Sequence, residues 1–231
     1  MHHFSDIYLQ VRQKEHRIYT DEEVLELPYL KVHTHSKEWK IRAYNAELLR
    51  NYIQKLYPQG VNIVEIGSGN GWLVNFLSQI PDSHITGTEI NDYELEQAKR
   101  LFKKSTLHFE AKDISEIDFS KYNVVIFAAS VQYFENPQRI FDHVFSQNPD
   151  AEITCIDSFW YKNDHEAQQA KQRSKKYYTE LGYPEMAEYY YHHTFEILKP
   201  YHFSILNNGF MYKMRLKWSG LPFMPCISIK Q

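Results

Sequence analysis

The chain has 231 residues, a hydrophobic content of 43% and a formal net charge of −3, which together fit one α/β domain with an added cap. This charge balance argues against a general polyanion-binding surface. The two cysteines, Cys155 and Cys226, lie in strand-like segments and are expected to be buried thiols in a reducing compartment. Residues 1–6 are too polar for a signal peptide, and no apolar run approaches the ~20 residues of a membrane helix, so we expect a cytoplasmic protein.

Residues 1–57 have helical patterns and are expected to form an N-terminal helical cap. The sequence Thr20-Asp-Glu-Glu23 is a capping box, and the short helix that it begins must end before Pro28. A second helical segment follows over residues 36–57, where apolar residues recur with i, i+4 spacing.

Residues 58–231 are expected to form a core in which strands and helices alternate, which implies right-handed crossovers and a parallel sheet covered on both faces. The run from Tyr122 to Ala128 is continuously apolar, as a central strand buried on both faces should be. The expected strands are 61–66, 84–89, 106–110, 122–128 and 151–157, with two further candidates at 201–206 and 222–230. The expected helices are 71–80, 91–104, 136–146 and 163–181.

The most informative segment is Val61-Asn-Ile-Val-Glu-Ile-Gly-Ser-Gly-Asn-Gly-Trp72, a strand that runs into three alternating glycines and then a helical pattern. Glycines allow a strand to turn sharply into a helix while backbone N–H groups point at a ligand. Trp72 stands where dinucleotide-binding turns carry a third glycine for close helix–strand packing, which argues against NAD or FAD. Glu65, two residues before the first glycine, suits a ligand with a positive charge.

This segment resembles motif I of the class I S-adenosylmethionine-dependent methyltransferases, and the resemblance covers residues 60–160 well and the rest loosely. It implies a Rossmann-like, seven-stranded, mostly parallel sheet of order 3-2-1-4-5-7-6 with the last strand antiparallel, and S-adenosylmethionine as cofactor. The cofactor-binding residues that it implies in this motif are Glu65, Gly67, Ser68, Gly69, Asn70, Gly71 and Trp72.

Further cofactor contacts are expected at the ends of the next strands. Glu89, followed by Ile90, ends a strand about 20 residues after the glycine turn, where a carboxylate can accept both hydroxyls of a ribose. NAD enzymes use the same device, and an acid at a helix start is also favoured by the helix dipole. In the family, an acid after the third strand binds the adenine amino group and the next backbone N–H reaches a ring nitrogen. Asp113 and Ile114 match this by position, although Asp113 could also be a solvated turn residue.

The segment Ala128-Ala129-Ser130 leaves the fourth strand at the switch region of the sheet, where ligands bind in open α/β folds, and is expected to contact the cofactor. The N-terminal segment, including Trp39 and Arg42, resembles the leader of some bacterial methyltransferases without assigned substrates. This suggests that the leader caps the cofactor pocket with one of these two residues near the cofactor's carboxylate. Alternatively, Trp39 packs the helix on the core and Arg42 is a surface residue.

The long connection 158–199 is expected to be a substrate-side insertion, because connections of this length tend to be functional. Its tyrosines could form core packing or an aromatic lid over the acceptor. The expected substrate contacts are Tyr133, Tyr161, Tyr190 and His192. A general base is needed only if the acceptor must lose a proton early, and the unranked candidates are His165, His192, His193 and Tyr133. No histidine fragment has three or four converging ligands at recognised spacing, so no metal site is expected.

The expected function is therefore methyl transfer from S-adenosylmethionine to a small-molecule acceptor, with the oligomeric state left open. One alternative is an RNA or other nucleic-acid methyltransferase, against which the acidic charge balance and the missing Asn-Pro-Pro-Tyr and Pro-Cys acceptor motifs both count. The other alternative is a non-catalytic S-adenosylmethionine-binding protein, because no acceptor motif in the chain is diagnostic.

Overall fold

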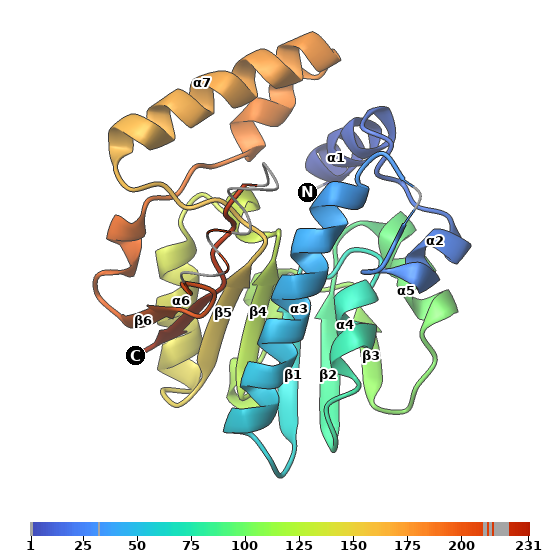
Figure 1. Ribbon diagram of the computed structural model, residues 1–231, viewed down its shortest axis with the longest axis vertical. Helices are drawn as coiled ribbons and strands as arrows, with labels where there is room; N and C mark the ends of the chain where they lie inside the picture. The colour runs from blue at the N-terminus through green and yellow to red at the C-terminus, as the bar shows by residue number, and fades with distance from the viewer. Residues whose placement is uncertain (1, 32, 210–211, 213, 215–221) are drawn as a thin grey trace.

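A computed structural model of the chain describes residues 2–31, 33–209, 212, 214 and 222–231. Its centre is a seven-stranded sheet of order β3-β2-β1-β4-β5-β7-β6 (Figure 1). The strand β7 is antiparallel to both of its neighbours, and the remaining strand pairs are parallel. The predicted fold class and strand order are thus confirmed. The strands are β1 (Val61–Ile66), β2 (Ser83–Thr88), β3 (Leu107–Glu110), β4 (Val124–Ala128), β5 (Glu152–Ile156), β6 (His202–Ile205) and β7 (Ile227–Lys230).

The helices follow the predicted order along the chain. The α-helices are α1 (His2–Lys14), α2 (Asp21–Glu26), α3 (Ser36–Leu56), α4 (Trp72–Leu77), α5 (Asp92–Leu101), α6 (Pro137–Gln147) and α7 (Asp164–Leu181). The 3₁₀ turns are η1 (Ile114–Glu116), η2 (Phe119–Lys121), η3 (Val131–Tyr133), η4 (Pro184–Tyr189) and η5 (Phe195–Leu198). The described helices include none that is long and apolar enough to cross a membrane.

Local sequence signals set several of these boundaries. The capping box of Thr20 and Glu23 is formed and begins α2. Asn163 caps α7, and Gly182 ends it in the left-handed conformation at φ 93°. β2 ends one residue earlier than expected, because the Glu89 carboxylate turns back to accept the N–H groups that follow it. The expected strand 222–230 is also shorter and begins only at Ile227.

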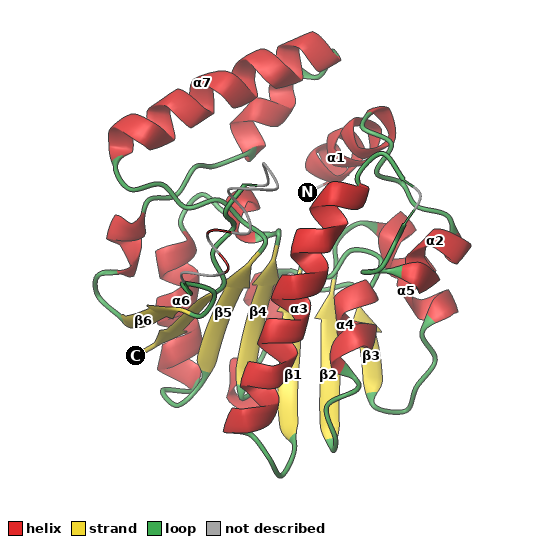
Figure 2. Ribbon diagram, in the orientation of Figure 1, coloured by secondary structure: helices red, strands yellow, loops and turns green. Residues whose placement is uncertain are grey.

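Helices cover both faces of the sheet, as the continuously apolar fourth strand predicted. One hydrophobic cluster joins α3 and α4 to one face and includes Leu49, Leu73 and Ile63. A second cluster joins α6 to the opposite face and includes Phe141 and Phe127. Figure 2 shows α3 and α4 crossing the near face of the sheet. This packing fixes the tips of β1 and β4, from which the site is built.

A third hydrophobic cluster joins the N-terminus to the long connection after β5. Ile7 and Val11 of α1 pack with Tyr178 of α7 and Met186 of η4. In Figure 1, α1 and α7 lie at the end of the sheet toward which the arrows of β1, β4 and β5 point. The tyrosines of the connection that pack against this cluster are Tyr183, Tyr189 and Tyr190. A large part of the aromatic belt is therefore core packing, and it forms a roof over the strand ends.

Candidate functional site

Two adjoining cavities lie at the C-terminal ends of the parallel strands. The larger has a volume of about 350 Å³ and the smaller about 180 Å³. Both are lined by Gly67 and Ala129, which directly follow β1 and β4, and by Tyr8 of α1 and Tyr133 of η3. The cavities therefore meet above the two central strands, at the place where open α/β sheets bind ligands.

The glycine turn after β1 supplies backbone to both cavities. Gly67 lines both of them, while Gly69 lines the larger one at φ 53° and donates its N–H to Glu89 Oε2 over 2.9 Å. Gly71 lines neither cavity, contrary to the expectation that it contacts the cofactor. A Cβ at Gly71 would lie 2.6 Å from the Phe109 ring and 2.8 Å from Ala98 Cβ, so this glycine permits close packing of the turn.

Glu89 is held rigidly in the wall of the smaller cavity. Its carboxylate accepts the backbone N–H groups of Gly69, Ile90 and Asn91 at 2.8–2.9 Å. Burial raises its pKa above the usual range, and these three N–H donors oppose that rise. The side chain is thereby fixed at the tip of β2, as the sequence predicted for the ribose-binding acid.

The smaller cavity also contains the two residues that were expected at an adenine ring. Asp113 and Ile114 follow β3 and line it, together with Ile90 and Ser130. Asp113 also begins η1, because its Oδ1 accepts the N–H of Ser115 at 3.0 Å. A carboxylate at the end of an apolar slot fits a flat heterocycle that carries an amino group.

Glu65 is a buried carboxylate on the side of the larger cavity. Its exposed fraction is 2%, and Oε2 has no hydrogen-bond partner among the described residues. Burial and the nearby carboxylates of Glu89 and Asp157 raise the pKa of Glu65 well above its usual range. A cationic ligand would favour the ionised form of such a buried acid. Ser68, Asn70, Trp72 and Ala128 line the same cavity.

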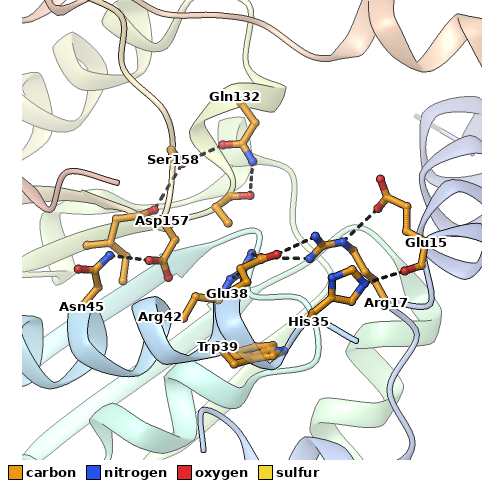
Figure 3. Close-up of polar contacts among 12 residues, drawn as sticks. Glu15, Arg17, His35, Glu38, Trp39, Arg42, Asn45, Gln132, Asp157 and Ser158 are labelled. Carbon is orange, nitrogen blue, oxygen red and sulfur yellow. Dashed lines mark hydrogen bonds and ion pairs between the residues drawn. The ribbon is translucent and has the colours of Figure 1, made fainter. Parts of the chain in front are cut away.

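The N-terminal segment closes one wall of the larger cavity with an ion-pair network (Figure 3). Glu38 accepts from Arg17 at 2.7 and 3.0 Å and from Arg42 at 2.8 and 3.0 Å. Although burial opposes it, these two arginines lower the pKa of Glu38 to about 2. The guanidinium of Arg42 also lies over the Trp39 ring, 5.0 Å from its centroid. Both residues proposed for the leader therefore reach the cavity.

Arg12 and Glu94 are charged residues of this cavity that the sequence interpretation did not select. Arg12 of α1 lines it, and its Nε has no hydrogen-bond partner in the described ranges. Glu94 of α5 is 5% exposed, and its Oε2 likewise lacks a partner there. Burial and Glu89 raise the pKa of Glu94 to about 7, while Arg12 lowers it. In the sequence, Glu94 is indistinguishable from an ordinary acid in the first turn of a helix.

The residues that directly follow β4 and β5 have an unusual backbone conformation. Ala129 and Asp157 both adopt left-handed backbone conformations, at φ 53° and 57°. Such residues cost free energy and concentrate at functional sites. Ser158 Oγ donates to Gln132 Oε1 at 2.8 Å, and Gln132 Nε2 donates to the Ala129 carbonyl at 2.6 Å, which ties the two tips together (Figure 3). No sequence motif marked Asp157 as a site residue.

The candidate catalytic and substrate residues separate into two groups. Tyr133 and Tyr190 line the larger cavity and contact each other edge-on, with ring centroids 5.8 Å apart. The expected contacts that line neither of the two cavities are Tyr161, His165, His192 and His193.

Each of these outlying residues has a local explanation. His165 is exposed on α7 and bonds Gln169 at 3.0 Å. His192 Nε2 lies 3.0 Å from Ser174 Oγ, and burial lowers its pKa to about 4. His193 contacts the Val131 carbonyl at 3.2 Å. Tyr161 pairs with residue 194 in an isolated bridge. The structure thus places all three histidines away from the cavities at the strand ends.

The sheet order and the paired cavities define a Rossmann-like methyltransferase of class I. A family model described as a methyltransferase domain matches residues 58–210, which is more than half of the chain. The chain belongs to this methyltransferase domain family. This confirms the class that the glycine motif predicted, for which S-adenosylmethionine is the methyl donor.

Individual relatives are more distant. A malonyl-[acyl-carrier protein] O-methyltransferase of Ilyobacter polytropus is 31% identical over 88 residues, which are 37% of this chain. The match spans 34% of that protein, or about a third of its length.

Two solved structures share the fold over nearly their whole length. The plantazolicin methyltransferase BpumL, solved with a desmethylPZN analogue and SAH, has a TM-score of 0.57 at 16% identity and covers 100% of this chain and 99% of its own. The magnesium protoporphyrin IX methyltransferase ChlM of Synechocystis PCC 6803, solved with SAM, has a TM-score of 0.57 at 11% identity, covering 96% and 97%. At these identities the likeness concerns the fold.

Proposed function

We propose that this enzyme transfers the methyl group of S-adenosylmethionine to a small-molecule acceptor, with adenosine in the smaller cavity and the acceptor in the larger one. The observation that carries the proposal is the junction of the two cavities at Gly67 and Ala129, directly above the central strands. A donor that spans this junction presents its reactive centre to the larger cavity.

The residues of the smaller cavity suit the nucleoside part of the donor. Glu89 would accept the ribose hydroxyls, Asp113 the adenine amino group, and the N–H of Ile114 would donate to a ring nitrogen. Glu65 would face the cationic amino group of the methionine part, because its buried Oε2 has no other partner within the described ranges. Gly69 leaves room for the close approach of the donor to the turn.

The bound donor supplies an electrophilic methyl group on a sulfonium, and methyl transfer is an in-line displacement. The protein's part is then to align two reactants in a site that excludes water, which can lower the barrier by ~7–11 kcal/mol. Tyr133, Tyr178 and Tyr190 wall the larger cavity and would orient the acceptor. We therefore propose that residues 158–199, together with the cap 1–57, form the acceptor side of a core that spans 58–231.

A small acceptor is supported by two further observations. The larger cavity is partly covered by α1 and by the α7 segment, which limits the space above the strand ends. Acidic side chains line it more than basic ones do, which is unfavourable for a nucleic-acid backbone. The relatives above are named as methyltransferases of plantazolicin, of magnesium protoporphyrin IX and of malonyl-[acyl-carrier protein], so their acceptors differ from one another.

The test is incubation of the enzyme with methyl-labelled S-adenosylmethionine and separate acceptor pools. One pool is a low-molecular-mass cell extract, and the others are total RNA and genomic DNA. We expect label to appear only in low-molecular-mass products, with stoichiometric release of S-adenosylhomocysteine. Label in RNA or DNA would overturn the choice of acceptor. Tight donor binding without transfer to any pool would instead indicate a non-catalytic binding protein.

A further inference from the structure

Asp157 is a buried acid in the wall of the larger cavity, and one of its two carboxylate oxygens has no hydrogen-bond partner among the described residues. It directly follows β5, lines the larger cavity and is 5% exposed. Its Oδ1 accepts from Asn45 Nδ2 at 2.8 Å, whereas Oδ2 has no partner in the part of the chain that the structure describes (Figure 3). Burying an unpaired carboxylate oxygen is costly, so its retention here calls for a ligand.

A buried chain of amides holds Asp157 in this position. Asn207 Nδ2 donates to Asn45 Oδ1 at 3.2 Å and to the Met224 carbonyl at 2.8 Å, and Asn207 Oδ1 accepts the N–H of Cys226 at 2.9 Å. Asn45 and Asn207 are almost completely buried. This chain links α3, β5 and the segment before β7, and it orients one carboxylate oxygen while leaving the other for the cavity. The left-handed backbone of Asp157 adds a local cost that the surrounding packing must offset.

The charges around the larger cavity indicate what the ligand is. Glu15 and Glu38 pair with Arg17 and Arg42 in one closed network, with nitrogen–oxygen distances of 2.7–3.3 Å. Arg42 is near enough to lower the pKa of Asp157, which burial raises, but it forms no ion pair with Asp157 within 4 Å in the described structure.

Among the described residues that line the larger cavity, the acids without an ion pair in this network are Glu65, Glu94 and Asp157, and the cation outside the network is Arg12. The donor carries one carboxylate, for Arg12, and one amino group, for Glu65. Glu94 faces the glycine turn, because a Cβ at Gly69 would lie 3.4 Å from its Oε2. Asp157 is then left for the acceptor, and a cationic group beside its free oxygen would favour the ionised carboxylate.

We infer that Asp157 binds the protonated amino group of an amine acceptor and takes the proton that must leave before methyl transfer. This inference rests on the proposed function, because it assigns the larger cavity to the acceptor. The tyrosine rings that line the same cavity suit such a ligand, since ammonium groups are attracted to aromatic faces.

The step is balanced without any further reactant. The ammonium acceptor donates one proton to Asp157 Oδ2 and becomes a neutral amine with a lone pair. That lone pair forms the new nitrogen–carbon bond as the sulfur–carbon bond of the donor breaks, and the electron pair of the broken bond stays on sulfur. The product is a methylated ammonium ion, and Asp157 returns its proton to solvent when the product leaves. A positioned base of this kind contributes ~10²–10⁴-fold to the rate.

The test uses two ligands that need no knowledge of the acceptor. S-adenosylhomocysteine lacks the transferred methyl group, whereas sinefungin carries an amino group in its place and so puts a positive charge toward the acceptor site. Affinities for both are measured by calorimetry in the wild type, in Asp157→Asn and in the control Asp150→Asn. Asn tolerates left-handed backbone as Asp does, so the variant should keep its fold, and its melting temperature checks this. Asp150 is exposed.

We expect the wild type and Asp150→Asn to bind sinefungin roughly tenfold more tightly than S-adenosylhomocysteine, as one charge-assisted contact predicts. Asp157→Asn should lose this preference while its affinity for S-adenosylhomocysteine stays unchanged. A preference that is absent from the wild type, or that persists in Asp157→Asn, would overturn the inference. So would an equal loss of both affinities, because Asp157 would then hold the donor's own amino group. Failure of the wild type to bind either ligand would refute the proposed function as well.

Discussion

The rings of Tyr8 and Tyr133 meet edge-on, with centroids 5.6 Å apart and planes at 89°, in the wall that the two cavities share. Tyr8 belongs to α1, near the N-terminus, and Tyr133 to the turn after β4. Burial raises the pKa of both hydroxyls above their usual range, so both are neutral at physiological pH. In the proposed complex the donor passes this pair, which makes α1 part of the binding site.

Replacing Tyr8 should therefore weaken donor binding. We expect Tyr8→Ala to reduce the affinity for S-adenosylhomocysteine roughly tenfold, since one aromatic wall and its edge contact are lost at a cost of about 1–2 kcal/mol. Tyr8→Phe keeps the ring and should bind normally. Calorimetric titration of both variants measures this. Equal affinities in the two variants would mean that the ring of Tyr8 does not contact the donor.

Glu89 offers a test of the smaller cavity. We expect Glu89→Ala to lose ~1.5–3 kcal/mol of donor binding for each hydrogen bond to the carboxylate, less whatever water restores. The melting temperature should also fall, because Gly69, Ile90 and Asn91 lose their acceptor. Binding is therefore measured well below that temperature. Glu110→Ala, a half-exposed acid at the end of β3, is the control and should bind normally. If Glu89→Ala bound the donor within twofold of wild type, Glu89 would be a structural acid only.

The glycine turn allows binding and folding to be separated. A Cβ at Gly69, a residue that lines the larger cavity, meets only ordinary contacts, the nearest being Glu94 Oε2 at 3.4 Å. The φ of 53° costs a non-glycine residue about 1–2 kcal/mol, so Gly69→Ala should fold with slightly reduced stability but bind the donor poorly. A Cβ at Gly71 collides with Phe109 and Ala98, so Gly71→Ala should lose about 2–4 kcal/mol of stability. Chemical denaturation and calorimetry on both variants test this. The reverse assignment of the two phenotypes would contradict the site as described.

Glu94 predicts a pH dependence of stability in the absence of ligand. Its pKa is raised from 4.5 to about 7 in the folded protein, so the folded state holds a proton that the unfolded chain has released. This difference in pKa stabilises the folded state by on the order of 3 kcal/mol below pH 4.5, and the stabilisation is lost as the pH rises to 7. Relative to the wild type, Glu94→Gln should gain unfolding free energy as the pH rises over this range, because it lacks this loss. Some slope should remain, because the pKa of Glu65 is raised as well.

The matched control for this measurement is Glu96→Gln, on the exposed side of the same helix. It should reproduce the wild-type profile. The lowered pKa of His192 makes stability rise with pH over the same range, so the difference between Glu94→Gln and the wild type is the test. Profiles of equal slope in the two proteins would show that Glu94 is not held in a protonated state.

Alternating apolar segments predicted a parallel α/β sheet, and the strand order followed from the resemblance to the methyltransferase family. Glu65 and Glu89 were selected because each stands at or near a strand end, and Asp113 because it matches the family by position. The sequence assigned Gly71 to the cofactor together with the other glycines of the motif. Its packing against Phe109 was not visible there, because Phe109 lies far from it in sequence.

The acceptor side could not be predicted in the same way. Arg12, Glu94 and Asp157 acquire their importance from burial and from neighbours distant in the chain, and neither appears in a single sequence. The three histidines were chosen for their chemistry alone, and the long connection folds so that they lie away from the cavities. Tyrosines of that connection had two possible roles, and the structure uses them for both, as core beneath α7 and as cavity wall.

The most direct test of the account is a pair of calorimetric titrations on the purified full chain, one with S-adenosylmethionine and one with NAD. We predict saturable binding of S-adenosylmethionine, accompanied by a rise in melting temperature through mass action on the folded state. NAD should give neither signal, because Trp72 replaces the third glycine of the dinucleotide-binding turn. Saturable binding of NAD with no response to S-adenosylmethionine would contradict the assignment of the two cavities.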